Sequence, residues 1–286
     1  MATAEVDTAG EALRQSRAAS RAEAKAIRQE LDPYRWRYRV GSLLVAIAAF
    51  GLWELIPRSG LVSYIILPPA SQVANALYTL VTADYFMKHF LITLGEIWWG
   101  FLAGTIIGLT LGILLAVVRP LKRLTYPFVV AFQAIPKIVL APLFIAWFGF
   151  GQSSKIVMAI AMSFFPLMIN TMVGIENIPG DTIRLMQSLR ASRWQIFRKV
   201  ELPGAAPLIF AGVQVALTFA LVGAIVGEFV SASQGMGYLL DSFNFQLKID
   251  RVFAVIIILS ALGAVFYFTL EWLDKKLIYW RPERGV

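Results

Sequence analysis

The chain has 286 residues, of which 58% are hydrophobic and 15% are charged, and its formal net charge is +8. A soluble domain has roughly 45–50% apolar and about 25% charged residues, so this composition indicates a membrane protein. Cysteine is absent and histidine occurs once, which excludes disulfides and thiolate metal sites and argues against a histidine-based metal site or an intramembrane hydrolase. The sequence has no Gly-Lys-Ser/Thr phosphate loop, so we expect no ATP site of that kind in this chain.

Residues 1–39 form a polar N-terminal tail without the apolar core and cleavage site of a signal peptide. The tail ends in YRWRYR (34–39), where aromatic residues alternate with arginines. Aromatic rings favour the headgroup zone and arginines favour anionic lipid, so we expect this run to contact the membrane surface. Nucleic-acid binding is the weaker alternative, because the run directly precedes an apolar segment.

Six apolar stretches follow, each long enough to cross a hydrocarbon core of roughly 30 Å as a helix. They cover residues 40–57, 91–118, 124–148, 153–173, 206–230 and 252–274. The sequence therefore predicts an all-α polytopic membrane protein, with six transmembrane helices within residues 40–274 and a C-terminal tail at 275–286.

The distribution of lysine and arginine predicts the orientation. Of the 26 basic residues, most lie in the two tails and in residues 119–123 and 174–205, which would share one side of the membrane. Loops rich in these residues remain in the cytoplasm, so we expect both termini to be cytoplasmic.

Two segments on the opposite side are predicted to fold at the surface. In residues 67–80, two prolines precede a short amphipathic pattern, with Ser71 as a candidate N-cap and apolar residues at Val73, Leu77 and Leu80. Residues 231–251 contain a glycine turn followed by a second amphipathic stretch.

The second span carries a glycine every four residues, at Gly100, Gly104, Gly108 and Gly112. Small residues at this spacing share one stripe of a helix and let another helix approach closely. Tight packing within the chain is the first interpretation, and a dimer or gating seam is the alternative.

The third span contains candidate residues of a solute pathway: Gln133, Pro136 and Lys137. In a continuous helix, Gln133 and Lys137 share a face, and Lys137 lies on the order of 20 Å from the cytoplasmic end. A charge at such depth costs at least about 2.5 kcal/mol and usually faces protein or water. Snorkelling to the headgroups and pairing with a buried carboxylate are the alternatives.

Glu228 is the fourth pathway candidate, because it lies near the outer end of the fifth span and could pair with Lys137 or shape an outer gate. Such a pair leaves open an ion-coupled secondary transporter, although no paired half-length repeat is visible. We expect Glu96 to reach water and His89 to be solvated near the outer surface.

Residues 174–205, between the fourth and fifth spans, are predicted to fold rather than to serve as a plain tether. Pro179-Gly180 ends the preceding helix, and Asp181 is a candidate N-cap for a new one. Apolar residues then recur at helical spacing, at Ile183, Met186 and Leu189, and we expect this face to pack on the spans.

A second short helix is predicted to begin at Ser192, because Ser192 and Gln195 fit a capping box. We expect Leu202-Pro203-Gly204 to end this helix. Its apolar face would contain Trp194, Phe197 and Val200, packed on the spans, while the basic residues that face outward would be Arg184, Arg190, Arg193, Arg198 and Lys199. Two capped helices favour a docking element for another protein over a basic stop signal lying on lipid.

The run SLRASRWQIFRKVELPGAAP resembles the cytoplasmic loop of importer-type ABC transporter permeases, whose motif is Glu-Ala-Ala, three residues, Gly, nine residues, Ile-x-Leu-Pro. The end of the motif matches at Val200, Leu202 and Pro203. The beginning departs from it: Arg184, Leu185 and Met186 stand at the Glu-Ala-Ala positions, and Arg190 stands at the Gly position. IPKIVLAPLFIAWFGFG (135–151) and GEFVSASQGMGYLL (227–240) resemble the branch that imports nitrate, sulfonates, taurine and related solutes.

This resemblance implies a type I ABC permease (MetI-like) fold in a bacterial plasma membrane, and a chain that is not itself an enzyme. Residues 181–203 would act as a coupling helix that docks on a separate cytoplasmic ATPase, which binds ATP and magnesium; this chain would hold no cofactor. The further partners implied are a second permease subunit, in the first instance an identical copy, an external solute-binding protein and membrane lipid. The solute would be a small anion such as nitrate, a sulfonate or taurine. The ATPase-coupling residues would be Arg184, Met186, Leu189, Arg190, Ser192, Arg193, Trp194, Phe197, Leu202 and Pro203.

Overall fold

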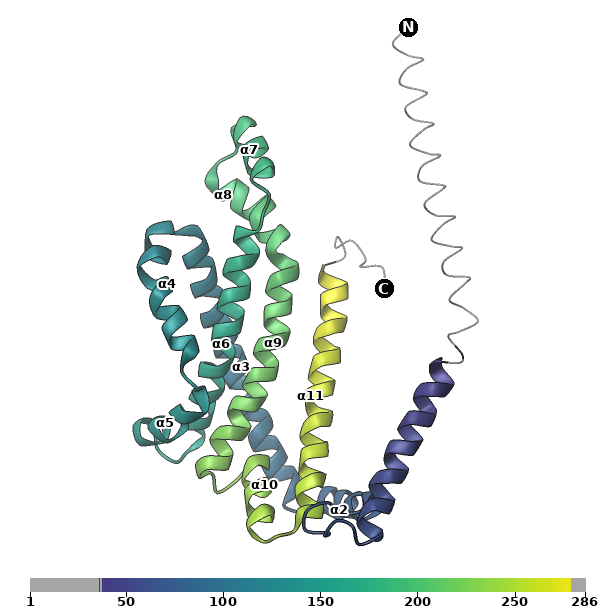
Figure 1. The fold of residues 1–286 in the computed structure, drawn as a ribbon. Helices are drawn as coiled ribbons and strands as arrows, with labels where there is room; N and C mark the ends of the chain where they lie inside the picture. Colours follow the sequence, from purple (N-terminus) through teal and green to yellow (C-terminus); the bar gives the residue numbers. More distant parts are fainter. Residues whose placement is uncertain (1–35, 37, 279–286) are drawn as a thin grey trace. The chain divides into compact units, whose positions relative to one another are not determined.

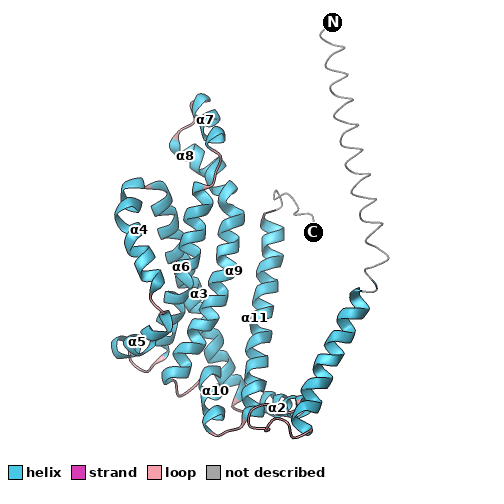
Figure 2. Ribbon diagram, in the orientation of Figure 1, coloured by secondary structure: helices cyan, strands magenta, loops and turns pink. Residues whose placement is uncertain are grey.

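The computed structural model describes residues 36 and 38–278, and every regular element within them is helical (Figure 2). Five of these helices are long and apolar enough to cross a membrane, or six if one bent pair forms a single span. The expected all-helical membrane protein is therefore confirmed. The chain divides into two compact units, Met1–Ser71 and Gln72–Val286.

The first unit contains the helix Tyr38–Arg58, which corresponds to the first predicted span. The indole N–H of Trp53 donates to the carbonyl oxygen of Pro68 at 3.0 Å. The backbone N–H and the hydroxyl of Ser71 donate to the carboxylate of Glu54, at 2.9 and 2.8 Å. The prediction of Ser71 as an N-cap is wrong, because α2 (Ala70–Val81) begins one residue earlier and the Ser71 side chain binds Glu54 instead.

The core of the second unit consists of α3 (Phe86–Val117), α6 (Gln152–Glu176) and α9 (Leu202–Ser231), which pack side by side (Figure 1). Buried residues of all three helices form one apolar cluster: Ile97, Phe101, Ala159, Leu167, Ala216, Leu217, Ala220 and Ala224. These helices match the second, fourth and fifth predicted spans.

The glycine stripe of α3 lies against α6 of the same chain. A Cβ atom added at Gly108 would lie 2.7 Å from the carbonyl oxygen of Phe164, and one at Gly112 would lie 2.6 Å from that of Met168. Real Cβ atoms do not approach other atoms so closely, so the two backbones can meet here because glycine has no side chain.

The third predicted span is not one helix. It consists of α4 (Arg119–Ala134), the short 3₁₀ helix η1 (Lys137–Leu140) and α5 (Ala141–Phe148), with a bend of 89° at the break. Pro136 cannot donate a hydrogen bond, and it forces Ile135 into an extended conformation (φ −70°, ψ 124°). The expectation that Gln133 and Lys137 share a helical face is therefore wrong, and the depth derived for Lys137 from a continuous helix does not hold.

Two further helices of the second unit are α10 (Met236–Phe245) and α11 (Ile249–Leu277). With α2 they form a second apolar cluster, whose buried members include Ala76, Leu80, Met236, Leu239 and Val255. Val73 and Leu80 are both buried in α2, so the predicted amphipathic helix of residues 67–80 is confirmed. Figure 1 shows α10 and α5 at one end of this unit, and α7 (Gly180–Ser188) with α8 (Arg193–Ile196) at the other.

Candidate functional site

The segment between α6 and α9 begins with α7. Pro179 occupies the N-cap position, with φ of −56°, and no side chain caps the helix. The prediction of Asp181 as the N-cap is therefore wrong: Asp181 lies in the first turn, 3.6 Å from Arg184. A carboxylate there still favours the helix, because it lies near the positive end of the helix dipole.

A tight turn at Arg190 separates α7 from α8. Arg190 has φ of +58°, a left-handed conformation that costs a residue with a side chain roughly 1–2 kcal/mol. The turn is closed by hydrogen bonds from Arg190 N–H to the Gln187 carbonyl (2.9 Å) and from Ala191 N–H to the Met186 carbonyl (3.0 Å). Arg190 stands at the position where the permease motif has glycine, and its conformation explains why glycine suits that position.

The second helix begins with the predicted capping box. The backbone N–H of Gln195 donates to Ser192 Oγ at 3.3 Å, and the backbone N–H of Ser192 donates to Gln195 Oε1 at 2.8 Å. Both bonds of the motif are present, so this prediction is confirmed.

Ser192→Ala is expected to destabilise the start of α8 by about 1 kcal/mol, because an N-terminal amide group loses its acceptor. Hydrogen exchange at the Gln195 amide should rise about fivefold, the factor that corresponds to this free energy. Ser188→Ala is the matched control, since the Ser188 hydroxyl binds only the Leu185 carbonyl within its own helix. Equal exchange rates at Gln195 in both variants would contradict a capping role.

The chain continues from α8 into α9 without a stop. Phe197–Glu201 form a π-helical turn, and Leu202 begins α9 with Pro203 in its first turn. The prediction that Leu202-Pro203-Gly204 ends the second helix is therefore wrong. Proline is tolerated in the first turn of a helix, where its missing N–H would have no partner. Arg193–Ser231 thus form one continuous helical run of 39 residues.

One side of this segment is anchored and the other is exposed. Ile196 is buried, at 1% exposure, whereas Trp194, Leu189 and Leu185 are 65%, 69% and 60% exposed. The expectation that Trp194 and Leu189 pack on the spans is wrong. The exposed indole of Trp194 stacks on the ring of Phe197, with centroids 5.7 Å apart.

The predicted outward-facing basic residues are all exposed: Arg184, Arg190, Arg193, Arg198 and Lys199. Apolar and basic groups therefore share the surface that the segment presents.

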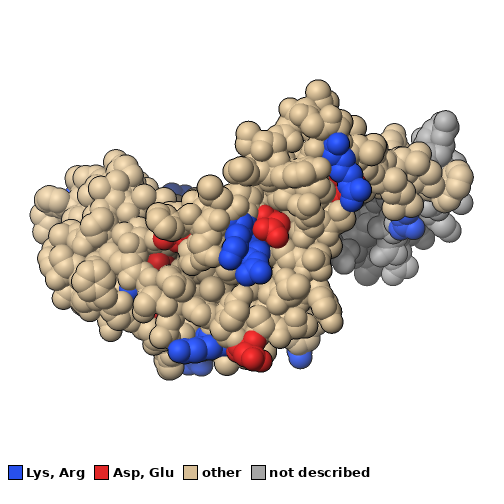
Figure 3. Space-filling view, turned by 90° about the horizontal axis from the view of Figure 1, so that it is seen from below, with Lys and Arg blue, Asp and Glu red and all other residues tan. Residues whose placement is uncertain are grey.

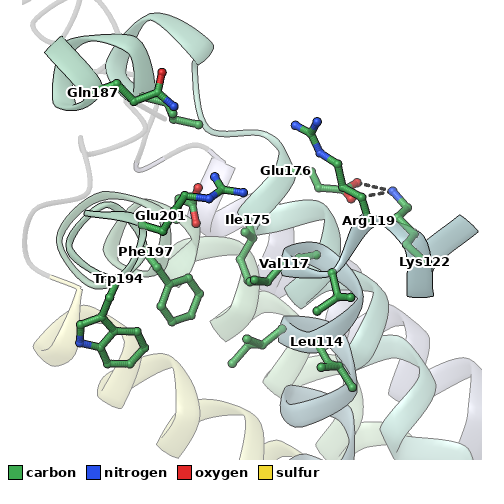
Figure 4. Close-up of a pocket in the computed structure, with 15 residues that line it drawn as sticks. Leu114, Val117, Arg119, Lys122, Ile175, Glu176, Gln187, Trp194, Phe197 and Glu201 are labelled. Atoms are coloured by element: carbon green, nitrogen blue, oxygen red, sulfur yellow. Dashed lines mark hydrogen bonds and ion pairs between the residues drawn. The ribbon is translucent and has the colours of Figure 1, made fainter. Parts of the chain in front are cut away.

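A cavity of about 700 Å³ lies beside the segment, toward the ends of α3, α4 and α6 (Figure 4). The ammonium of Lys122 binds the carboxylate of Glu176 at 2.6 Å and so joins α4 to α6 at its rim. The residues around this cavity include Leu114, Val117, Ile175, Gln187, Arg193, Trp194, Phe197 and Glu201. The aromatic pair is therefore bordered by open space on this side.

The candidate pathway residues do not come together as predicted. Glu228 is buried, at 1% exposure, and accepts hydrogen bonds from the Thr93 hydroxyl and the Gly237 N–H, each at 2.6 Å. The ammonium of Lys137 lies 5.4 Å from the ring centre of Phe165. No ion pair joins Lys137 to Glu228 in the part of the chain that the structure describes. The remaining two candidates, Gln133 and Pro136, are exposed.

Two buried charged residues were missed. Glu96 was expected to reach water but is 3% exposed, and Lys155, near the start of the fourth predicted span, is 2% exposed. The Lys155 ammonium donates to the Phe150 carbonyl at 2.7 Å. His89, expected to be solvated, accepts a hydrogen bond from the Gly235 N–H at Nδ1. His89 and Lys155 lie in the first turns of α3 and α6 and Glu96 lies further along α3, and a hydropathy pattern does not tell which side of these helices faces protein.

Comparisons with known proteins give the family. The family described as "Binding-protein-dependent transport system inner membrane component" matches residues 104–279, more than half of the chain. A riboflavin transport system permease of Chloroflexus aurantiacus is 36% identical over 88% of this chain and 94% of its own length. A putative aliphatic sulfonates transport permease of Bacillus subtilis is 31% identical over 90% of this chain and 93% of its own length.

The fold also matches a solved structure, the MetNI methionine ABC transporter in an inward-facing conformation, with a TM-score of 0.60 at 23% identity. This match covers 67% of our chain and 95% of the matched chain. The chain therefore belongs to the binding-protein-dependent transport system inner membrane components, the non-catalytic permease subunits of ABC importers.

Proposed function

We propose that this permease imports small sulfonate-type anions and is driven by a separate cytoplasmic ATPase that docks on residues 181–203. The observation that carries the docking proposal is the exposed surface of α7 and α8, where Trp194, Leu185 and Leu189 stand among arginines. Exposed aromatic residues with arginine are typical of the energetic centres of protein interfaces.

The continuity of Arg193–Ser231 supports a mechanical role for this surface. A force applied at Trp194 acts on α9 directly, because no flexible loop separates them. α9 packs closely on α6: a Cβ atom added at Gly223 would lie 2.7 Å from Ala159 Cα. Two ATPase subunits would draw together the α8 segments of two permease copies. In each copy, α9 and the α6 helix packed on it would then move as one rigid body.

We propose that the α7–α8 end of the second unit faces the cytoplasm, with both chain termini on that side. The positive-inside rule supports this orientation, because α7, α8 and the following residues carry Arg184, Arg190, Arg193, Arg198 and Lys199. The last turn of α11, with Lys275 and Lys276, lies toward the same end of the unit (Figure 1). An external solute-binding protein would then deliver the solute at the α10 end.

The proposed solute class rests on two observations. One relative, 31% identical over 90% of this chain, is named for aliphatic sulfonates. Lys137 stands directly after the break at Pro136, half-buried, at a point where non-helical backbone interrupts a span. Such breaks are tolerated where the backbone is buried in protein or lines a cavity, and a cation there suits an anion.

The test is uptake by liposomes that contain this chain, its ATPase and its binding protein. We expect ATP-dependent accumulation of taurine or butanesulfonate, and none of riboflavin. Accumulation of riboflavin alone would overturn the solute class while leaving the transport function intact. Uptake driven by a proton gradient, with the ATPase left out, would instead support an ion-coupled secondary transporter.

Lys137→Ala is expected to reduce sulfonate uptake at least about tenfold, because a hydrogen bond to a charged group contributes about 1.5–3 kcal/mol. The variant should still assemble with the ATPase, since Lys137 lies outside α7 and α8. Lys88→Ala removes an exposed cation and should leave uptake unchanged. Normal uptake kinetics in Lys137→Ala would remove this residue from the pathway.

A further inference from the structure

The first backbone N–H groups of α10 are held by side chains of two other helices. The N–H groups at the start of a helix have no partner within it. Three of these N–H groups donate to side chains from other helices. The N–H of Gly235 donates to His89 Nδ1 (2.9 Å), that of Met236 to Thr93 Oγ1 (2.7 Å) and that of Gly237 to Glu228 Oε2 (2.6 Å). We name the three acceptor residues, His89, Thr93 and Glu228, the α10 clamp.

Glu228 is the centre of this clamp. One carboxylate oxygen accepts the Gly237 N–H and the other accepts the Thr93 hydroxyl, so that Thr93 can in turn accept the Met236 N–H. Thr93 and Glu228 are fully buried, at 0% and 1% exposure. Hydrogen bonds that involve a carboxylate are about twice as strong as neutral ones, so Glu228 contributes most to the attachment.

The two glycines of QGMG (234–237) make this arrangement sterically feasible. Gly235 has φ of +114°, and a Cβ atom added there would lie 2.1 Å from Glu228 Oε1. A Cβ atom added at Gly237 would lie 2.7 Å from the Ile225 carbonyl oxygen and 2.8 Å from Glu228 Cβ. Because these two residues have no side chain, the start of α10 can approach the Glu228 carboxylate this closely.

The same stretch of α9 also holds the turn between α5 and α6. The ammonium of Lys155 donates to the Phe150 carbonyl at 2.7 Å and lies 3.4 Å from both oxygens of Ser231. Glu96 is a further buried carboxyl group next to Glu228, and its Oε2 atom has no hydrogen-bond partner. The end of α9 is thus attached both to α10 and to the Phe150 turn. Figure 3 shows the face seen from this end, where charged side chains are few and some basic and acidic groups lie next to each other.

We propose that Glu228 is a positioning residue that makes α10 move together with α9 during transport. The helical run from Arg193 to Ser231 begins at the proposed ATPase-docking surface and ends three residues beyond Glu228. The clamp therefore connects α10 to α9, and α9 connects it to the docking surface at the opposite end of the unit. Glu228 acts through the backbone of α10, and each of its two carboxyl oxygens accepts one hydrogen bond from protein.

This inference rests on the coupling part of the proposed function, and its test needs no knowledge of the solute. The permease–ATPase complex in nanodiscs is compared by hydrogen exchange, with and without ATP and vanadate, at amides 236–239. In the unmodified protein we expect the exchange of these amides to change when the ATPase closes.

Glu228→Leu is expected to raise exchange at Met236 and Gly237 at least about tenfold, because a charged acceptor is lost. The response of α10 to ATP should disappear, while basal ATP hydrolysis remains. Glu228→Gln keeps an acceptor and should stay within about threefold of the unmodified protein. Ser163→Ala is the control: it removes a buried hydroxyl of α6 that binds the Ile160 carbonyl of its own helix and is not part of the clamp, and it should leave both readouts unchanged.

Thr93→Val and Thr93→Ser keep the inference testable if Glu228→Leu does not assemble. Valine removes the hydroxyl and should free the Met236 amide, whereas serine keeps the hydroxyl and should restore its protection. Unchanged exchange in Glu228→Leu or Thr93→Val would overturn the clamp. An α10 that still responds to ATP after its amides are freed would overturn the positioning role. Failure of sulfonate uptake would overturn the solute class and leave these results unaffected.

Discussion

Replacement of both Trp194 and Phe197 by aspartate is expected to abolish stimulated ATP hydrolysis and to release the ATPase from the permease. The two rings stack on each other beside the buried Ile196, with Trp194 exposed and Phe197 half-buried. Central aromatic residues of an interface contribute 2 kcal/mol or more each, which corresponds to a loss of affinity of about 30-fold for one of them. The double variant should therefore fail to retain the ATPase during purification.

The controls for this experiment separate the rings from the added charge. Thr82→Asp adds a carboxylate at an exposed position directly after α2, outside residues 181–203, and should leave ATPase binding intact. Trp194→Phe keeps an aromatic ring and should retain most of the binding. The permease itself should insert normally in all variants, because Trp194 is 65% exposed and outside the core. Normal stimulated ATPase activity in the double variant would contradict docking at this surface.

The sequence predicts best those features that depend on neighbouring residues. The capping box of Ser192 and Gln195 is recognisable because both of its bonds lie within four residues. The spans are recognisable because length and hydropathy suffice. The bend at Pro136 was not predicted, since a proline inside an apolar run is compatible with a kinked helix as well as with a break.

Features that depend on distant partners could not be predicted. Glu228 and Thr93 are 135 positions apart, and neither pattern nor spacing connects them. Amphipathic spacing predicted Trp194, Phe197 and Val200 as the apolar face of α8, but the buried residue is Ile196 and Trp194 is exposed. Spacing shows that a face avoids water, and it does not show whether the chain itself or another protein covers that face.

Glycine-to-alanine substitutions in α3 are expected to reduce stability by different amounts. The loss at each position depends on which atom the new methyl group contacts. Gly95→Ala is the control, because no heavy atom lies within 4 Å of the added Cβ, and the helix propensity of alanine favours it by up to about 1 kcal/mol. Gly104→Ala meets first the Ser163 hydroxyl, a side chain that can rotate away. Gly108→Ala meets the Phe164 carbonyl oxygen, which belongs to the backbone of α6 and cannot move alone.

We therefore expect the thermal stability of the purified permease to fall in the order Gly95→Ala, Gly104→Ala, Gly108→Ala, and overpacking to cost the last variant about 1–3 kcal/mol. Gly108→Leu combined with Gly112→Leu should give no monodisperse protein in size-exclusion chromatography, because α3 can no longer approach α6. If the stripe instead formed a seam between two permease copies, each variant monomer would keep its stability and the dimer alone would dissociate. The two explanations thus differ in which species is lost, and the backbone contacts of Gly108 and Gly112 within one chain favour loss of the folded monomer.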